Sequence, residues 1–191
     1  MNNMRVEIPD DIMKLVSAFA DVQTDTVLEH YQNRSQTNAE KIKEDCIVGK
    51  LGEFGTYQYF IGRGYACTKP DMNVYVPEDK RFASDLIGDG KKLCIKSQSI
   101  EQAGRFGLSW VFQNSGEGSG HHDKILDVGG DELFVGCMVD DNIVDIKAII
   151  PMEWVLQCGM LKDPVLVKYH NIKKVLYYKD LRESLDDLLA R

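Results

Sequence analysis

The hydrophobic pattern of this chain changes its period once, and this change restricts the possible folds more than any other feature. Over residues 9–31 and 38–61 the apolar side chains recur every three or four positions, as on one face of a helix. Asp10 and Asp11 precede the first pattern, where acidic side chains favour a helix N-terminus, and this segment forms one helix or two. From residue 65 onward the period shortens to that of β-strands separated by turns.

Strand-like segments occupy most of the middle of the chain. They are residues 65–69, 72–76, 81–87, 92–98, 108–113, 132–139 and 144–151. The last residues, 180–191, return to leucine spacing typical of a helix. Helices before and after a run of strands predict an α/β protein with a central mixed sheet of about five or more strands flanked by helices.

A chain of 191 residues can bury a full core, and its length requires no second domain. We therefore predict one domain in four parts. These are an N-terminal helical segment (1–35), a core that carries the motif described below (38–113), a glycine-rich segment (114–131) and C-terminal strands with a helix (132–191). The glycine-rich segment forms either a long loop or a loop with one short helical turn.

Cysteine usage, charge and hydropathy exclude several classes of protein. The five cysteines are widely spaced and form no CxxC pair, so neither a disulfide framework nor a structural zinc site is indicated. No apolar run approaches the roughly 18 residues that span a bilayer, so we expect no membrane insertion and a cytoplasmic location. The net charge of −7 argues against coating nucleic acid by bulk electrostatics. Any contact with DNA must be local.

Three glycines recur inside the second predicted helix, at Gly49, Gly52 and Gly55. Each lowers helix stability by about 1 kcal/mol relative to alanine, so something must offset the loss. One explanation is close packing of this helix against a sheet. A second, compatible explanation is that close packing brings Glu53 within reach of groups on that sheet.

Asp85 and Lys96 have the spacing expected for two facing strands of a hairpin. Asp85 stands in FASDLIGDG, and Lys96 follows eleven residues later in the strand KLCIKSQ. An aspartate binds a hard cation such as Mg²⁺ through oxygen, and the main-chain carbonyl before the lysine supplies another oxygen. The lysine orients or deprotonates the attacking water and offsets developing charge. This arrangement suits hydrolysis of a phosphodiester.

With these residues, the chain resembles the PD-(D/E)xK, or restriction-endonuclease-like, superfamily over roughly residues 45–113. In that family a helix with an acidic residue precedes a hairpin with an aspartate, and the next strand carries (D/E)-x-K. Glu53 is similar to the helix acid, Asp85 to the hairpin aspartate and Lys96 to the lysine. Gln98 is similar to a glutamine that some branches place after the lysine.

The resemblance implies a metal-dependent DNA endonuclease with a restriction-endonuclease-like core. Asp85, Glu53 and the main-chain carbonyl of Ile95 would hold Mg²⁺, for which Mn²⁺ could substitute. Lys50, one turn before Glu53, and Gln113, on a following strand, would contact the DNA. One such site nicks a strand, and a twofold homodimer cuts both. Small nucleases of this kind are common in bacteriophages and in restriction or repair systems.

One position departs from the family pattern, because Cys94 stands where the acid of the lysine strand is expected. A thiol is a poor ligand for Mg²⁺. Either Glu53 supplies the missing carboxylate from the helix, or the site no longer cuts. In the second case the protein is a catalytically inactive nuclease-fold subunit with a binding or regulatory role.

Two further groups of residues are candidates for the site. The dipeptide Pro70-Asp71 lies far upstream of the lysine strand, so Asp71 ranks below Asp85. His121 and His122, followed by Asp123, could bind a metal or a phosphate, but no third ligand stands at a telling spacing. We therefore favour an exposed histidine pair in a loop.

Overall fold

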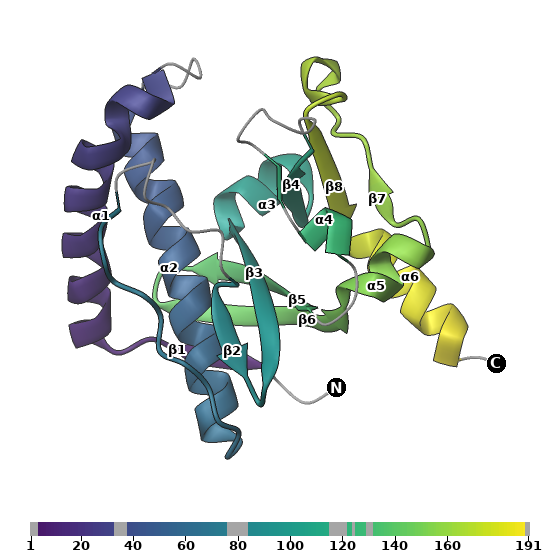
Figure 1. Ribbon diagram of the computed structural model, residues 1–191, viewed down its shortest axis with the longest axis horizontal. Helices are drawn as coiled ribbons and strands as arrows, with labels where there is room; N and C mark the ends of the chain where they lie inside the picture. Colours follow the sequence, from purple (N-terminus) through teal and green to yellow (C-terminus); the bar gives the residue numbers. More distant parts are fainter. Residues whose placement is uncertain are drawn as a thin grey trace.

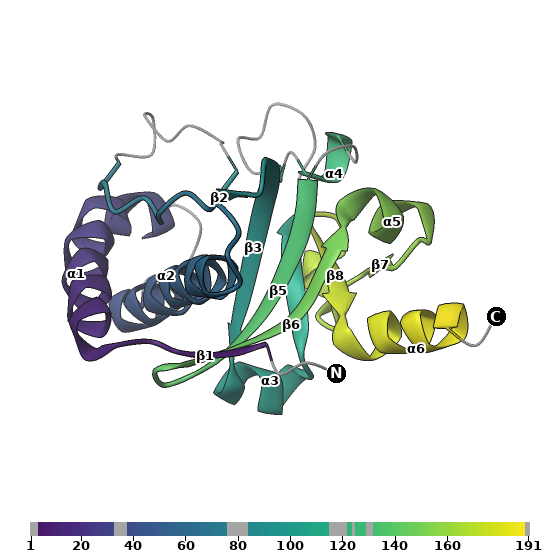
Figure 2. The same cartoon turned by 90° about the horizontal axis from the view of Figure 1, so that it is seen from below.

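The structure is a computed structural model. It describes residues 4–32, 38–75, 84–114, 122–123, 125–128 and 132–189. A five-stranded mixed sheet lies between two layers (Figure 1 and Figure 2). Two long helices cover one face, and a three-stranded sheet with shorter helices lies against the other. This architecture confirms the predicted α/β class and the central sheet flanked by helices.

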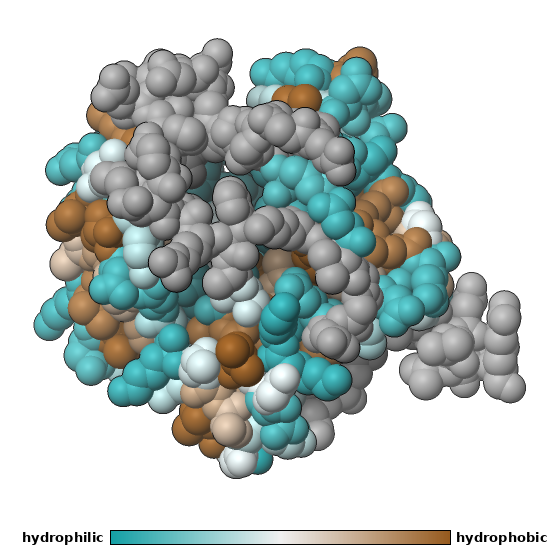
Figure 3. Space-filling view, viewed as in Figure 1, coloured by the Kyte–Doolittle hydropathy of each residue, from teal (hydrophilic) through white to brown (hydrophobic). Residues whose placement is uncertain are grey.

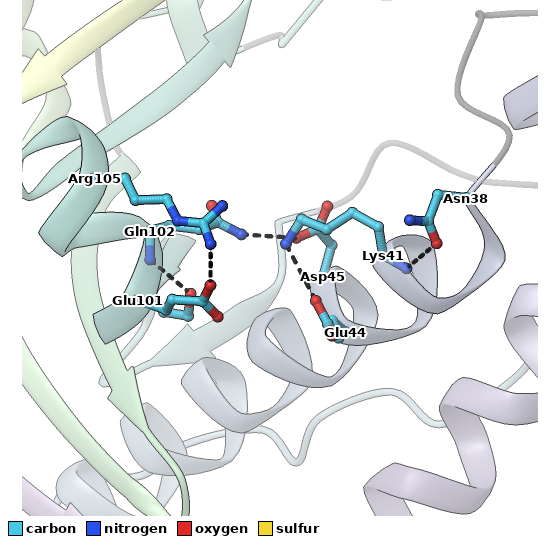
Figure 4. Close-up of polar contacts among 8 residues, drawn as sticks. Asn38, Lys41, Glu44, Asp45, Glu101, Gln102 and Arg105 are labelled. Atoms are coloured by element: carbon cyan, nitrogen blue, oxygen red, sulfur yellow. Dashed lines mark hydrogen bonds and ion pairs between the residues drawn. The ribbon is translucent and has the colours of Figure 1, made fainter.

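Two long helices form the first layer, α1 (Asp10–Gln32) and α2 (Ala39–Gly62), as the helical periodicity predicts. The first pattern forms one helix, and α2 lies between α1 and the sheet (Figure 2). Asn38 caps α2, because its side-chain oxygen accepts a hydrogen bond of 3.0 Å from the Lys41 amide (Figure 4). None of the helices in the described residues is long and apolar enough to cross a membrane.

The central sheet has the strand order β1-β6-β5-β3-β2. Its strands are β1 (Arg5–Glu7), β2 (Leu86–Gly88), β3 (Lys91–Ser99), β5 (Glu132–Asp140) and β6 (Ile143–Pro151). β2 and β3 form an antiparallel hairpin, β3 and β5 are parallel, and β5 and β6 are antiparallel. The parallel pair requires a crossover, which passes through the second layer.

The second sheet has the order β4-β8-β7. Its strands are β4 (Ser109–Gln113), β7 (Leu161–Lys162) and β8 (Lys173–Tyr177). The helices of this half are α3 (Ile100–Phe106), α4 (Ile125–Val128), α5 (Met152–Gln157) and α6 (Tyr178–Leu189), with a 3₁₀ turn at Val167–Tyr169. α4 is the short helical turn allowed for in the glycine-rich segment. The remaining residues of that segment, 115–121, 124 and 129–131, lie outside the described residues.

Two of the strand predictions are wrong in the described residues. Residues 65–69 contribute a single bridge, between Cys67 and Gly88, and residues 72–75 form no strand. The segment follows α2 and lies beside β2. Two main-chain hydrogen bonds join it there, from Thr68 to the Ile87 carbonyl and from Asp89 to the Ala66 carbonyl, which are too few for a ladder. Strand β2 is also shorter than its predicted segment, because it begins at Leu86.

Glycines let α2 approach the sheet closely. A Cβ atom at Gly52 would collide with the Ser97 hydroxyl, and one at Gly55 would lie 2.6 Å from Val144 Cβ. Gly49, in contrast, faces open space, with nothing within 4 Å of such an atom. Two of the three glycines therefore have the packing role predicted for them.

Trp110 joins the two sheets. Its side chain is 1 % exposed, and its indole nitrogen donates a hydrogen bond of 3.0 Å to the Cys137 carbonyl on β5. The ring packs edge-on against Phe134, with centroids 5.2 Å apart. Gly136 provides the space, since a Cβ there would lie 2.5 Å from the indole ring. Trp110 is thus a core residue.

A polar contact links α2 to α3, which follows β3 directly (Figure 4). Gln102 donates a hydrogen bond of 3.1 Å to Asp45, and Asp45 also pairs with Lys41 at 2.9 Å. Ser99, the last residue of β3, caps α3 by accepting a hydrogen bond from the Gln102 amide. The carboxyl end of β3 is therefore held against the first turns of α2.

Apolar surface is dispersed on the face shown in Figure 3. Separate apolar spots lie between hydrophilic residues there. On α1, Leu15 and Val22 are exposed to 46 % and 55 %. Scattered exposed apolar side chains of this kind are ordinary for a folded protein.

The glycine contacts predict opposite effects for two matched substitutions in α2. Gly49→Ala should raise the free energy of unfolding by about 0.5–1 kcal/mol, because alanine favours the helix and meets no neighbour. Gly55→Ala should lower it by about 1–3 kcal/mol, because the new methyl group collides with Val144. Urea unfolding of both variants tests this. A stabilised Gly55→Ala protein would show that the close packing is not required.

Candidate active site

Asp85 lies directly before β2 and is held against β3. Its carboxylate oxygen Oδ2 accepts a hydrogen bond of 2.6 Å from the Ile95 amide, and its own amide donates to the Leu93 carbonyl at 3.0 Å. The carboxylate thus meets a strand amide beyond the end of the β2–β3 ladder. The hairpin thereby brings Asp85 to the strand that carries Lys96.

Lys96 projects to the face of β3 that is turned away from α2. Strand geometry alternates side chains between the two faces, and Leu93 and Ile95 fill the core beneath α2. The Lys96 ammonium donates a hydrogen bond of 2.8 Å to Asp123 Oδ2 and lies 5.4 Å from the centre of the Phe112 ring. The Lys96 side chain is 26 % exposed. It is therefore partly accessible.

Opposing effects act on the charge of Lys96. Burial lowers the pKa of this ammonium, while electrostatic interactions with Cys94, Asp123 and Asp85 and the hydrogen bond to Asp123 raise it. The net pKa lies above the ordinary value for a lysine. In this arrangement Lys96 is a protonated cation at neutral pH.

Asp123 follows the histidine pair that we expected in an exposed loop, and it contacts Lys96. Its Oδ2 accepts hydrogen bonds from Lys96 and from the Gln113 amide, the latter at 3.0 Å, and its own amide donates to the Gln113 carbonyl. A bridge between Asn114 and His122 holds this segment beside the end of β4. No spacing rule in the sequence points to this contact, because a stretch of glycines and polar residues separates Asp123 from β4.

The two histidines of the same segment have different outcomes. His122 contacts Asp127 of α4, with 2.7 Å between its Nε2 and the carboxylate. His121 lies outside the described residues. His122 therefore has a partner within the protein, and it stands directly before Asp123 in the chain.

Cys94 shares the surroundings of Lys96. Burial raises the pKa of its thiol to about 12; Lys96 acts to lower it, and Asp85, Asp123 and Glu132 act to raise it. The thiol is therefore neutral at physiological pH, which opposes roles as a nucleophile or a metal ligand. Cys94 packs against the core formed with the second sheet.

Lys50 and Glu53 form an ion pair on α2, with 2.7 Å between the ammonium and the carboxylate. Their side chains are only 15 % and 16 % exposed. Lys50 also donates a hydrogen bond of 2.7 Å to the Asp71 carbonyl and lies over the Phe19 ring. The predicted helix acid thus belongs to a polar group that links α2 to the segment after it.

The Asp71 carboxylate organises its own loop. It accepts hydrogen bonds from the amide and side chain of Asn73 and from the Tyr75 hydroxyl. The hydrogen bond from the Asn73 amide is the main cause that lowers the pKa of Asp71 below its usual value, and burial acts against it. These contacts give Asp71 a local structural role, consistent with its rank below Asp85.

Both predicted glutamines lie near the junction of the two sheets. Gln98 is 8 % exposed; its carboxamide accepts a hydrogen bond of 2.8 Å from the Ser109 amide and donates one of 3.3 Å to the Gly107 carbonyl. It thus fastens β3 to the start of β4. Gln113, at the end of β4, is half-buried and holds Asp123 through its main chain.

The pKa values predict which cysteines react with a thiol reagent. Burial raises the pKa of Cys137, like that of Cys94, to about 12, so about one molecule in ten thousand carries either thiolate at pH 8. Cys158 is exposed. In the native protein at pH 8, Ellman's reagent should label Cys158 first, and Cys158→Ser should remove this fast phase. Fast labelling of Cys94 would contradict the described burial.

A comparison of the chain with models of known protein families gave no match, and neither curated proteins nor solved structures gave one. Among the described residues, no group of three or more histidine, cysteine, aspartate or glutamate side chains is arranged to hold a metal ion. The functional argument therefore depends on the geometry around Asp85 and Lys96.

Proposed function

We propose that this protein is a metal-dependent endodeoxyribonuclease with a restriction-endonuclease-like core. The observation that carries the proposal is the position of Asp85, whose carboxylate lies 2.6 Å from the amide of Ile95, the residue directly before Lys96. A carboxylate, a main-chain edge and a lysine thus lie together, an arrangement that suits metal-assisted hydrolysis of a phosphodiester.

The order of elements supports the proposed core. A long helix, α2, precedes the β2–β3 hairpin, and β3 then pairs in parallel with β5. α2 carries Glu53, the hairpin is preceded by Asp85, and β3 carries Lys96. This is the sequence of acid, hairpin aspartate and lysine strand that the resemblance implies.

The oxygen groups suit a hard cation. The amide and carbonyl of one strand residue point to the same neighbour, so the Ile95 carbonyl should face the side on which its amide meets Asp85. Mg²⁺ commonly takes one or two carboxylates and completes its shell with water and phosphate oxygens, so a site with few protein ligands fits it. A bound Mg²⁺ would generate the attacking hydroxide and offset charge on the phosphate, and Mn²⁺ would substitute. Glu53 is a further candidate ligand.

The raised pKa of Lys96 favours a role as a cation. A protonated lysine cannot accept a proton from water, but it stabilises negative charge that develops on the phosphate. Of the two proposed uses of this lysine, charge stabilisation agrees better with its protonation. Gln98 would act indirectly, by fixing the strand from which Lys96 projects.

Contact with DNA should be local, since the net charge of the chain is −7. Lys50 and Gln113 are the proposed DNA contacts, and Lys50 would have to exchange its contacts with Glu53 and Asp71 for a phosphate. A monomer would nick DNA. A homodimer with two sites would break both strands.

Conversion of supercoiled plasmid in Mg²⁺, Mn²⁺ or EDTA tests the proposal. The wild-type protein should give open-circle or linear DNA only with metal. Asp85→Ala and Lys96→Ala should each reduce the rate about 100-fold or more while the protein stays folded. Lys162→Ala is a matched control, because Lys162 also pairs with an aspartate, Asp180, at 2.9 Å on the second sheet. This variant should cut at the wild-type rate.

Two results would contradict the proposed activity. Equal cutting by the wild-type, Asp85→Ala and Lys96→Ala proteins would assign the cleavage to another site or to a contaminant. No conversion by folded wild-type protein in either metal would favour the alternative of a nuclease-fold subunit without catalysis.

A further inference from the structure

The lysine strand lacks the acid that the proposed metal site needs. Cys94 stands two residues before Lys96, and alternation along β3 places both side chains on the same face. A soft thiol is a poor partner for Mg²⁺, which prefers oxygen. A second carboxylate would therefore have to come from another part of the chain.

The segment after β4 brings Asp123 to this face. Its amide donates a hydrogen bond to the Gln113 carbonyl, and its Oδ2 accepts one from the Gln113 amide. Oδ2 also accepts a hydrogen bond of 2.8 Å from the Lys96 ammonium. Both of these side-chain hydrogen bonds end on Oδ2 of the carboxylate. The side chain is 27 % exposed, so a small ion can reach it.

Asp123 and Asp85 act on the same two side chains. The charges of both carboxylates raise the pKa of Lys96 and of Cys94, so all four side chains lie near one another. Glu53, in contrast, belongs to the helix that covers the opposite face of β3 and pairs there with Lys50. Asp123 therefore lies on the face of β3 from which the acid is missing, and Glu53 lies on the other face.

We infer that Asp123 supplies the second carboxylate of the metal site, in place of the acid that Cys94 replaces on β3. The inference rests on the proposed nuclease function. Asp123 pairs with Lys96 in the structure, and its carboxylate would bind the cation beside that lysine. The site thus combines Asp85 from the hairpin, Lys96 from β3 and Asp123 from the crossover.

Calorimetric titration with Mn²⁺, run beside the plasmid assay, tests the inference. Asp123→Asn keeps the shape of the side chain and an oxygen for the Gln113 amide, but it removes the charge. It should weaken Mn²⁺ binding about tenfold or more, as Asp85→Asn should, and it should slow cutting. Glu53→Gln should have a smaller effect on Mn²⁺ affinity. Asp180→Asn, which alters the Lys162 pair, is the control and should bind Mn²⁺ like the wild type.

A second substitution separates a ligand from a residue that merely holds Lys96. Cys94→Asp restores an acid to the expected strand position, so the double variant Cys94→Asp, Asp123→Asn should recover Mn²⁺ binding and cutting relative to Asp123→Asn alone. A purely structural role for Asp123 predicts no such recovery. Circular dichroism checks that each variant is folded, and Cys94→Glu replaces Cys94→Asp in the double variant if the latter is not.

The outcomes distinguish this inference from the proposed function. If the wild type cuts and Asp123→Asn binds Mn²⁺ and cuts equally well, Asp123 is not a ligand and the nuclease proposal stands. If the wild type neither binds Mn²⁺ nor cuts, the proposed function fails and the inference fails with it. Lost binding in Asp123→Asn with recovery in the double variant supports both.

Discussion

The close contact between α2 and the central sheet is the constraint on which the rest of the structure depends. Gly52 and Gly55 let the helix backbone lie against Ser97 and Val144, where any larger residue would force the layers apart. This contact buries Leu93 and Ile95 on the helix side. Because strand side chains alternate, it also directs Lys96 to the opposite face. The packing of one helix therefore decides where the lysine can act.

The same alternation divides the polar groups into two sets. Lys50, Glu53 and the Asp71 loop lie together on the helix side, and Lys96 and Asp123 lie on the other. Asp85 stands directly before β2, where the Ile95 amide donates a hydrogen bond to its carboxylate. A carboxylate at a strand end is well placed to exchange an amide contact for one with an ion, because little packing has to change.

Long, periodic elements were predictable from the sequence, and contacts made across the crossover were not. The two helices, β3, β4, β5 and β6 follow strong apolar patterns, and the glycine contacts were anticipated from their cost to α2. Residues 65–75 have strand-like composition but meet β2 through a single bridge, so propensity alone misled there. The hairpin could be inferred because Asp85 and Lys96 are close in sequence. Asp123 could not, since tertiary packing brings it to Lys96.

The parallel pairing of β3 with β5 has a consequence for how the protein is made. Lys92 pairs with Glu132, forty residues later, so this register must await synthesis of the whole crossover. The helices and the β2–β3 hairpin depend on nearer neighbours and can form earlier as the chain leaves the ribosome. During that interval one edge of β3 has no partner. The order of synthesis thus exposes this strand edge, and the lysine it carries, to other chains until β5 arrives.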